Sequence, residues 1–416
     1  MPLLSELRYK CVGFDAGEWR GFDSKVVLFR SIRMQARVLT IEEGKDLAQR
    51  TQPRVFPMRV LKVLGFLSTL GICFFIASMY MTRYYGIPNV VSQARSSFQV
   101  CWEEPRGLQW WIKPPSKLLH NMTDEELFWR ASMEPQVEKY PFKRVRKVAF
   151  MFLTIGPLPL SPLWEKYFKG NERLYSIYIH SLPNYKADFL ESSVFYRRQI
   201  PSQVSEWGKM SMCDAERRLL ANALLDISNE WFVLLSESCI PLYPFSITYR
   251  YLMRSRFSYV GAFDDPSPHG RGRYDPNMAP EVDISLWRKA SQWFEVNREL
   301  AVIIIKDTKF YPKFKEFCKP DCYVDEHYFP TMLTIETPHK IANRTITWVD
   351  WSRGGAHPAT FGKADITESF LKTIVEGQTC LFNGQKSNLC YMFARKFAPS
   401  ALEPLLQLAP DLLGYG

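Results

Sequence analysis

One segment of the sequence combines carboxylates and an imidazole with aromatic side chains. It reads Cys-Tyr-Val-Asp-Glu-His-Tyr-Phe over residues 322–329 and contains Asp325, Glu326 and His327. Burial beside aromatic rings raises the pKa of a carboxyl group towards the range in which it acts as a general base. The pKa of histidine already lies near neutrality, so His327 competes for this role. Alternatively, Asp325 and Glu326 begin a helix and only favour its dipole.

A second segment places two cations between aromatic residues. It is Phe-Ala-Arg-Lys-Phe over residues 393–397, with Arg395 and Lys396 adjacent. Two cations can neutralise a diphosphate leaving group as a metal ion would. The structural alternative is a solvated helix end.

Several catalytic motifs are missing from the sequence. It contains no Gly-x-Gly-x-x-Gly after a strand, no phosphate-binding Gly-x-x-x-x-Gly-Lys-Ser/Thr, no Gly-x-Ser-x-Gly and no His-Glu-x-x-His. Dinucleotide oxidoreduction, P-loop chemistry and serine hydrolysis therefore lose support. No Asp-x-Asp occurs either, and the side chains of the adjacent pair Asp264 and Asp265 would diverge in an extended chain. We expect no metal and no cofactor.

The elements that must position these segments alternate between strands and helices. Short apolar runs predict strands at Val148–Thr154, Leu174–His180, Trp231–Leu235 and Tyr259–Phe263. Helices are predicted at Leu163–Phe168 and at Ala215–Ile227, the second after a capping box at Ser211–Asp214. The run Ala301–Ile305 fits either element. This alternation predicts an α/β fold with a mostly parallel sheet flanked by helices, which binds ligands at the carboxyl ends of its strands.

Length and composition narrow the class of protein. The chain has 416 residues, 46% of them hydrophobic, and a net charge of +10. A sizeable core is therefore expected, and disorder is excluded. A net positive charge favours binding to nucleic acid, to an acidic membrane surface or to an anionic small molecule. Because no nucleic-acid-binding motif is present, we expect no nucleic-acid partner.

An uncharged segment predicts a membrane anchor. Residues 63–82 carry no charge between Lys62 and Arg83, and about 20 apolar residues cross a hydrocarbon core of ~30 Å. Basic residues are denser before this segment than after it, which keeps the N-terminus cytosolic. We expect a single-pass type II protein with a cytosolic tail at 1–62, a transmembrane helix at 63–82, a stem at 83–145 and a lumenal domain at 146–416.

The cysteines and sequons agree with a lumenal domain. Cys318/Cys322 and Cys380/Cys390 are close enough in sequence to be candidates for local disulfides, which an oxidising lumen permits. A zinc site at the first pair would lack a second pair at finger spacing. Asn121-Met-Thr and Asn343-Arg-Thr are N-glycosylation acceptors if they face the lumen.

These segments together resemble a known family. The sequence resembles the core-2/I-branching β-1,6-N-acetylglucosaminyltransferases of glycosyltransferase family 14, and more closely the plant branch of that superfamily. The similar stretches cover about residues 146–405 and are Val148–Pro159, Tyr175–His180, Val204–Leu225, Leu234–Pro244, Ser285–Arg298, Asp325–Leu333, Val349–Phe361 and Tyr391–Leu405. The resemblance implies a GT-A-like fold and inverting transfer from a nucleotide sugar without an essential metal.

The resemblance also implies roles for individual residues. Glu326 falls on the catalytic base and Lys396 on a diphosphate ligand. Arg271, Arg273 and Trp351 fall on positions that hold the acceptor. The sequence departs from the family at two places. Gly377 stands where a second arginine is expected, for which Arg353 or Arg395 is a candidate replacement, and Ser181 stands where the animal enzymes have an acidic residue.

We therefore expect a Golgi glycosyltransferase that transfers N-acetylglucosamine or another sugar to a glycan of the plant cell wall or of glycoproteins. Its partners are a nucleotide sugar, a glycan or glycoprotein acceptor, and the membrane. The rival hypothesis is a catalytically inactive, membrane-anchored glycan-binding protein of the same fold. A lumenal hydrolase would need a second carboxylate across the sugar, a role for which Asp264 and Asp265 are candidates.

Overall fold

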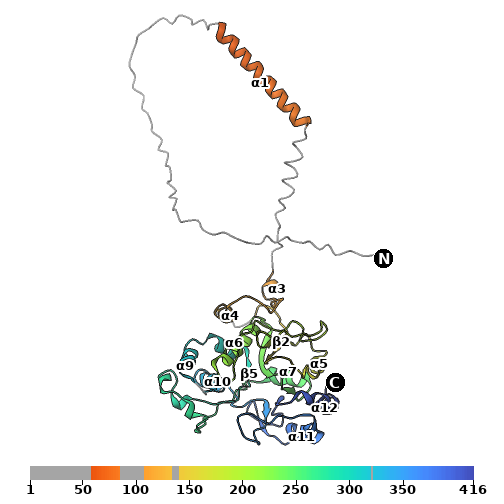
Figure 1. Cartoon of the computed structure of the whole chain (residues 1–416), viewed down its shortest axis with the longest axis vertical. Helices are drawn as coiled ribbons and strands as arrows, with labels where there is room; N and C mark the ends of the chain where they lie inside the picture. Colours follow the sequence, from red (N-terminus) through yellow and green to blue (C-terminus); the bar gives the residue numbers. More distant parts are fainter. Residues whose placement is uncertain (1–57, 85–106, 134–139, 320–321) are drawn as a thin grey trace, which may run out of the picture. The chain divides into compact units, whose positions relative to one another are not determined.

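The computed structural model describes residues 58–84, 107–133, 140–319 and 322–416 (Figure 1). The chain divides into two units, residues 1–101 and 102–416. Helix α1 (Met58–Tyr84) belongs to the first unit and is long and apolar enough to cross a membrane. It contains the whole span predicted at 63–82. Most of the predicted tail (residues 1–57) and parts of the predicted stem (85–106 and 134–139) lie outside the described residues, as does Cys101.

A four-stranded sheet forms the centre of the second unit. Its strands are β1 (Lys147–Leu153), β2 (Tyr175–His180), β3 (Asn229–Ser236) and β5 (Glu295–Asn297), in the order β2-β1-β3-β5. The pairs β1/β2 and β1/β3 are parallel, and β5 runs antiparallel to β3. The side chains of β1 alternate between two hydrophobic cores, one on each face of the sheet. A sheet buried on both faces explains why its strands are continuous apolar runs.

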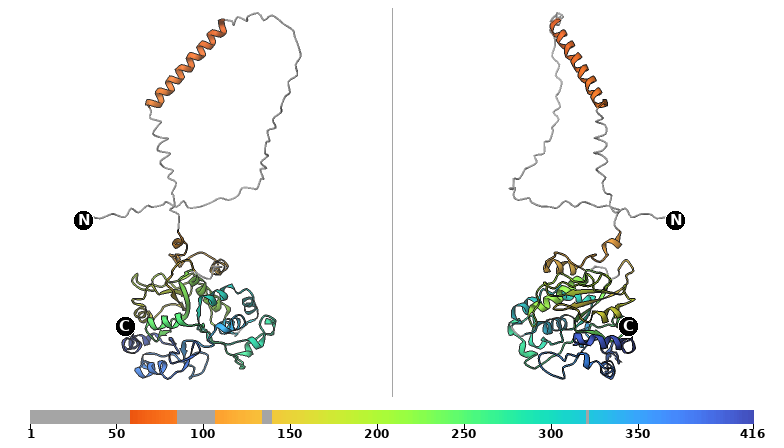
Figure 2. Two further views of the ribbon diagram at one scale, coloured as in Figure 1. Left: turned by 180° about the vertical axis from the view of Figure 1, so that it is seen from behind. Right: turned by 45° about the vertical axis from the view of Figure 1, so that its right-hand side comes forward.

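Helices cover both faces of this sheet (Figures 1 and 2). The helices of the second unit are α3 (Leu108–Trp111), α4 (Asp124–Ala131), α5 (Ser161–Phe168), α6 (Met210–Leu224), α7 (Phe245–Arg254), α8 (Arg298–Lys306), α9 (Phe310–Phe317), α10 (Val324–Glu336), α11 (Glu368–Val375) and α12 (Leu402–Leu408). One core packs the sheet against α5, α7 and α12, and the other packs it against α6, α8 and α10. The α/β fold with a parallel-rich, helix-flanked sheet is confirmed.

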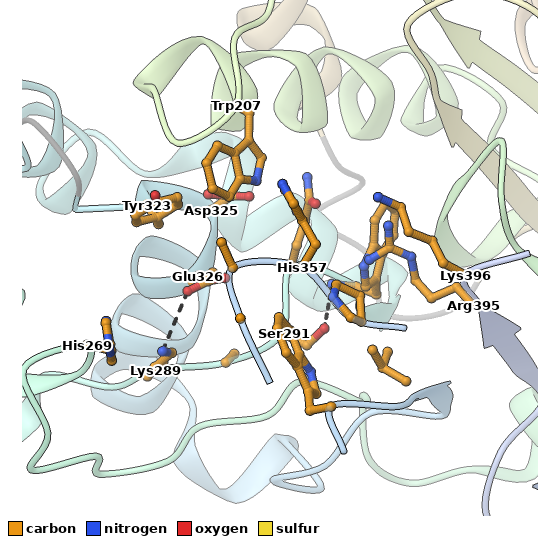
Figure 3. Close-up of a pocket in the computed structure, with 18 of the residues that line it drawn as sticks. Trp207, His269, Lys289, Ser291, Tyr323, Asp325, Glu326, His357, Arg395 and Lys396 are labelled. Atoms are coloured by element: carbon orange, nitrogen blue, oxygen red, sulfur yellow. Dashed lines mark hydrogen bonds and ion pairs between the residues drawn. The ribbon is translucent and has the colours of Figure 1, made fainter. Parts of the chain in front are cut away.

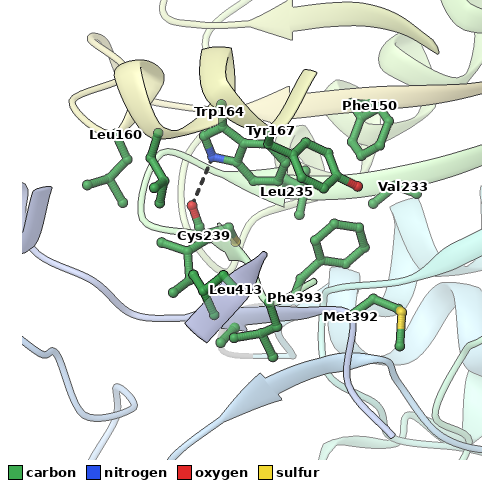
Figure 4. Packing of buried hydrophobic residues seen from close by; sticks show 14 of the residues in the cluster. Phe150, Leu160, Trp164, Tyr167, Val233, Leu235, Cys239, Met392, Phe393 and Leu413 are labelled. Carbon is green, nitrogen blue, oxygen red and sulfur yellow. Dashed lines mark hydrogen bonds between the residues drawn. The ribbon is translucent and has the colours of Figure 1, made fainter. Parts of the chain in front are cut away.

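Two smaller sheets complete the unit. One contains β4 (Ile240–Pro241), β9 (Phe393–Arg395) and β6 (Thr347–Val349), and the other is the hairpin of β7 (Cys380–Phe382) and β8 (Gln385–Ser387). Phe393 of β9 lies beside Phe150 and Trp164, whose indole N–H donates to the Cys239 carbonyl at 3.0 Å (Figure 4). The three-stranded sheet is thereby fixed against the central sheet.

Two predicted elements differ in the structure. The predicted strand Tyr259–Phe263 is wrong, because its ends form only isolated bridges, Tyr259 to Glu295 and Phe263 to Lys289. The partners change within five residues, so no continuous ladder can form. The capping box at Ser211–Asp214 is also wrong. Helix α6 begins at Met210, and the Ser211 hydroxyl accepts a bond from the Glu206 N–H instead.

The cysteine pairs and the ambiguous apolar run are resolved. Cys318 is bonded to Cys322 and Cys380 to Cys390, as their spacing suggested. Cys213 and Cys239 are free and buried. The run Ala301–Ile305 lies within α8, with its apolar side chains packed on the core beside α6.

Candidate active site

Both chemical segments of the sequence line one cavity. Its volume is about 650 Å³, within the usual range of roughly 300–1,000 Å³ for small-molecule sites. The cavity is bordered by the first turn of α10, the end of β9 and the turn Arg271–Arg273 (Figure 3). The segments before β5 and after β6 also border it. Its charged lining residues are Arg273, Lys289, Asp325, Glu326, Arg395 and Lys396. We call it the active-site cavity.

Glu326 presents its carboxylate to this cavity between two cations. Its Oε2 lies 3.1 Å from Arg273 Nη1 and 3.8 Å from Lys289 Nζ, and 27% of its side chain is exposed. The backbone carbonyl of Glu326 accepts a hydrogen bond from the Ala290 N–H at 2.8 Å. This bond holds the first turn of α10 against the segment that carries Lys289. The carboxylate is thus oriented and remains accessible to a substrate.

The two neighbours of Glu326 are in different environments. Asp325 is 4% exposed, and burial, with a smaller contribution from Glu326, raises the pKa of its carboxyl group to about 7. His327 is fully buried, its Nδ1 lies 2.8 Å from the Arg288 carbonyl oxygen, and burial lowers its pKa to about 4. His327 does not line the cavity, so it is not placed to contact a substrate there. The raised carboxyl pKa that the sequence predicted for this segment is found at Asp325.

Arg395 and Lys396 form a positive region of the same cavity. Arg395 ends β9, where it pairs with Val349 of β6, so the alternative of a solvated helix end is wrong. The Arg395 guanidinium lies 4.1 Å above the Trp293 ring. Burial lowers the pKa of both side chains, and Arg395 lowers that of Lys396 further. Within the described ranges neither forms an ion pair at 4.0 Å or less, and the negative charge of Glu237 only partly offsets the lowering of both pKa values. This region is therefore suited to receive an anion.

The structure places two of the three predicted acceptor residues in the active-site cavity and one outside it. Arg273 and Trp351 line the active-site cavity. Arg271 does not, because its guanidinium makes two bonds to the Asp264 carboxylate, at 2.7 and 2.6 Å. Asp264 and Asp265, the carboxylates that a hydrolase would need, do not line the cavity either. Of the two candidate replacements for the family's second arginine, Arg395 lines the cavity, whereas Arg353 stacks over Phe361 at 5.4 Å.

Other lining residues were not predicted from the sequence. They are Trp207, Phe263, His269, Lys289, Gln292, Trp293 and His357, among others. Trp207 is half exposed and packs on Tyr323 and His357, with ring centroids 4.7 and 4.9 Å apart. Lys289, Gln292 and Trp293 all fall within the stretch 285–298 that resembles the family. Their position in that stretch was the sequence signal that could have identified them as site residues.

The remaining predicted sites concern metal and glycosylation. Among the residues that the structure describes, no three His, Cys, Asp or Glu side chains gather where they could hold a metal ion. Asn121 and Asn343 are both exposed, and the Asn343 Oδ1 accepts a bond from the Ala262 N–H at 2.7 Å. Both side chains are accessible at the surface of the second unit.

Comparison with known proteins gives one family and one relative. The family model described as "Core-2/I-Branching enzyme" matches residues 148–375. The chain is 34% identical over 309 residues to a protein named glycosyltransferase BC10 from Oryza sativa subsp. japonica, which covers 63% of this chain and 76% of that protein. The range matched by the family model includes the position of Glu326.

Proposed function

The chain belongs to the Core-2/I-branching enzyme family and is a glycosyltransferase, and on this premise we propose that it transfers a sugar with inversion and without an essential metal. The donor is a nucleotide sugar and the acceptor is a glycan. Glu326 acts as the base, and Lys396 together with Arg395 neutralises the leaving diphosphate. Arg273 and Trp351 hold the acceptor.

The observation that carries the proposal is the presence of Glu326 and of the pair Arg395/Lys396 in one cavity. Figure 3 shows the carboxylate on one side and the two cations on the other. In a single displacement, the acceptor hydroxyl attacks the anomeric carbon while its proton passes to Glu326 Oε2 or Oε1. The bond from that carbon to the diphosphate oxygen breaks on the opposite face, so the configuration inverts. The cations stabilise the charge that develops on the departing oxygen.

Metal independence is supported by the two cations. A diphosphate leaving group requires positive charge, which a bound metal ion supplies in many transferases. Here Arg395 and Lys396 are partly buried and unpaired with carboxylates within the described ranges, so their charge is available to the ligand. This arrangement can replace a metal ion at the leaving group.

We place the enzyme in the Golgi membrane as a single-pass type II protein. Support comes from α1, which has a membrane-spanning length, and from the basic residues on the N-terminal side of its uncharged segment 63–82. The bonds Cys318–Cys322 and Cys380–Cys390 suit an oxidising lumen. Protease added to sealed microsomes should remove the N-terminal tail and leave the C-terminal domain intact until detergent is added.

The test of function is a nucleotide-sugar screen on the full-length chain in detergent. It follows diphosphate release and transfer to plant cell-wall and glycoprotein glycans, with and without a chelator. We expect one donor, N-acetylglucosamine-based or other, to be transferred equally well in both conditions. Abolition by the chelator with rescue by manganese would contradict metal independence. Glycan binding without diphosphate release from any donor would instead support an inactive binding protein.

A further inference from the structure

Trp207 exposes an aromatic ring inside the active-site cavity. It lines the cavity and is 50% exposed, although tryptophan is mostly buried in folded proteins. Phe263 and Trp351 line the same cavity and are each 53% exposed. Exposed aromatic surface in a concave site indicates a ligand with an apolar face. A pyranose ring is such a ligand, because one of its faces carries C–H groups while its hydroxyls project from the edge.

A short turn before α6 holds Trp207 in place. The Lys209 N–H donates a hydrogen bond to the Glu206 carbonyl at 3.1 Å, and the Glu206 N–H donates one to the Ser211 hydroxyl at 3.0 Å. Gly208 has φ +74°, whereas the φ of Trp207 is not positive. This is the pattern of a type II turn with glycine as its third residue. The Trp207 ring is therefore presented from a hydrogen-bonded turn, which lowers the cost of ordering it when a ligand binds.

Tyr323 connects Trp207 with the residues around the proposed base. The centroids of the Tyr323 and Trp207 rings lie 4.7 Å apart, and Arg273 Cζ lies 4.3 Å from the centre of the Tyr323 ring. Arg273 Nη1 in turn lies 3.1 Å from Glu326 Oε2. The Tyr323 carbonyl also accepts a hydrogen bond from the Glu326 N–H at 2.9 Å. The contacts that lead from Trp207 to the Glu326 carboxylate thus pass through one aromatic ring and one guanidinium.

Trp207 lies on the acceptor side of the cavity. Figure 3 shows Trp207 and Tyr323 on the side of Glu326, away from Arg395 and Lys396. In the proposed function the two cations receive the diphosphate, and the donor sugar points from there towards Glu326. The nucleoside is attached to the other end of the diphosphate, so it lies on the far side from Glu326. A ligand group at Trp207 therefore belongs to the acceptor.

We propose that the Trp207 ring stacks on a sugar residue of the acceptor, next to the residue whose hydroxyl reacts at Glu326. This inference rests on the proposed function, because it takes Glu326 as the place where the acceptor hydroxyl reacts. Since the contacts from Trp207 to Glu326 pass through Tyr323 and Arg273, the stacked sugar is a neighbour of the reacting sugar and not that sugar itself. The acceptor class is therefore a glycan of two or more pyranose residues, and not a monosaccharide.

The test measures how affinity depends on glycan length, by calorimetric titration of the full-length chain in detergent. The probes are glucose, galactose, xylose and N-acetylglucosamine, each with its β-1,4-linked disaccharide and trisaccharide. In at least one series the wild type should bind the disaccharide about tenfold more tightly than the monosaccharide, because the second ring gains the aromatic contact. Trp207→Ala should remove this gain and leave monosaccharide affinity unchanged. Trp207→Phe should restore part of the gain, because it keeps an aromatic face.

Two controls accompany this comparison. Trp129→Ala is the matched variant, because Trp129 is 69% exposed on α4 and does not line the cavity; it should leave the length dependence unchanged. Affinity for UDP should be equal in the wild type and Trp207→Ala, because we place the nucleotide on the other side of the cavity. If Trp207→Ala does not fold, Trp207→Phe carries the comparison.

Proton NMR of the bound disaccharide separates stacking from a merely structural role. The ring current of an indole shifts C–H protons that lie over its face upfield. In the wild type this shift should appear on one of the two sugar residues. It should disappear in Trp207→Ala and persist in Trp129→Ala. A tryptophan that only supported the turn would change stability without producing such a shift.

Three results would overturn the inference. They are the absence of any series in which the disaccharide binds more tightly than the monosaccharide, a gain that survives in Trp207→Ala, and a loss of UDP affinity in Trp207→Ala, which would place the nucleotide base on this ring. Any of these could occur in an active transferase, so the proposed function would stand. Conversely, a wild type that shows the length dependence and the ring-current shift but transfers sugar from no donor would contradict the proposed function and leave the glycan contact at Trp207 intact.

Discussion

Arg273 contacts Glu326 with one end of its guanidinium and covers an aromatic ring with its face. Its Nη1 lies 3.1 Å from Glu326 Oε2, and its Cζ lies 4.3 Å from the centre of the Tyr323 ring. An arginine that the family resemblance associates with the acceptor is thus bound directly to the proposed base. In the proposed mechanism, an acceptor that contacts Arg273 lies beside the carboxylate that we propose takes its proton.

The first prediction concerns the base. Glu326→Gln keeps the shape of the side chain but removes the proton acceptor, so we expect kcat to fall by about 10²–10⁴-fold. Donor affinity, measured by titration with the nucleotide sugar, should change little. The exposed Glu336→Gln on the same helix is the control. Near-normal turnover in Glu326→Gln would show that another group accepts the proton.

The second prediction concerns the leaving group. Lys396→Ala removes a cation that we place on the diphosphate, so kcat should fall by about 10²-fold and affinity for the bare nucleoside diphosphate should fall with it. Lys363→Ala is a suitable control, because Lys363 pairs with Glu403 at the exposed surface. An unaffected Lys396→Ala would place the diphosphate elsewhere.

The third prediction compares two arginines of the same turn. Arg273→Ala removes the contact with Glu326 inside the cavity, and we expect kcat/KM for the acceptor to fall at least about tenfold. Arg271→Ala breaks an exposed ion pair with Asp264, so a change below about twofold is expected. Steady-state kinetics with varied acceptor measure both. Equal losses would mean that the acceptor extends across Arg271, as the resemblance implies.

The fourth prediction concerns the loop that carries Trp207. Gly208 has φ +74°, and a Cβ there would lie 3.2 Å from the Tyr323 ring. Gly208→Ala should therefore lower the free energy of unfolding by about 1 kcal/mol, because alanine is strained at this positive φ. The added Cβ should also displace Tyr323 from Arg273 and so lower turnover. Gly170 has φ +79° with open space around it, so Gly170→Ala should show the stability loss alone. Thermal unfolding and kcat distinguish the two effects. Identical turnover in both variants would disprove the coupling through Tyr323.

The sequence predicts the parts of the fold that are specified locally. Strands β1, β2 and β3 are apolar runs because they are buried on both faces of the sheet. Strand β5 was not predicted. It has only three residues, and one of them is Glu295, whose burial raises its pKa to about 8 while Thr347 donates a hydrogen bond to it. Such a strand is defined by its partners and not by its own pattern.

The residues of the active-site cavity also differ in whether their local sequence predicts them. Glu326 and Lys396 stand in compact segments whose residue types already indicate chemistry. Lys289 and Trp207 are single residues in polar surroundings, and tertiary packing alone brings them to the cavity. Glu216 lies on a predicted helix, but its position near α10 depends on the contact of α6 with α10, two helices far apart in the chain. Periodicity along one helix does not report such a contact.

The proposed base and the proposed phosphate ligands come from separate layers of the molecule. Glu326 belongs to α10, which packs against the central sheet, whereas Arg395 ends a strand of the three-stranded sheet and Lys396 follows it. If these roles are correct, we expect mutations around Tyr323 and Arg273 to change acceptor choice more than they change nucleotide binding. A fold divided in this way can evolve to use new acceptors while it keeps the same donor. Chimaeras that exchange only the segment 263–273 between relatives would test whether acceptor choice follows that segment.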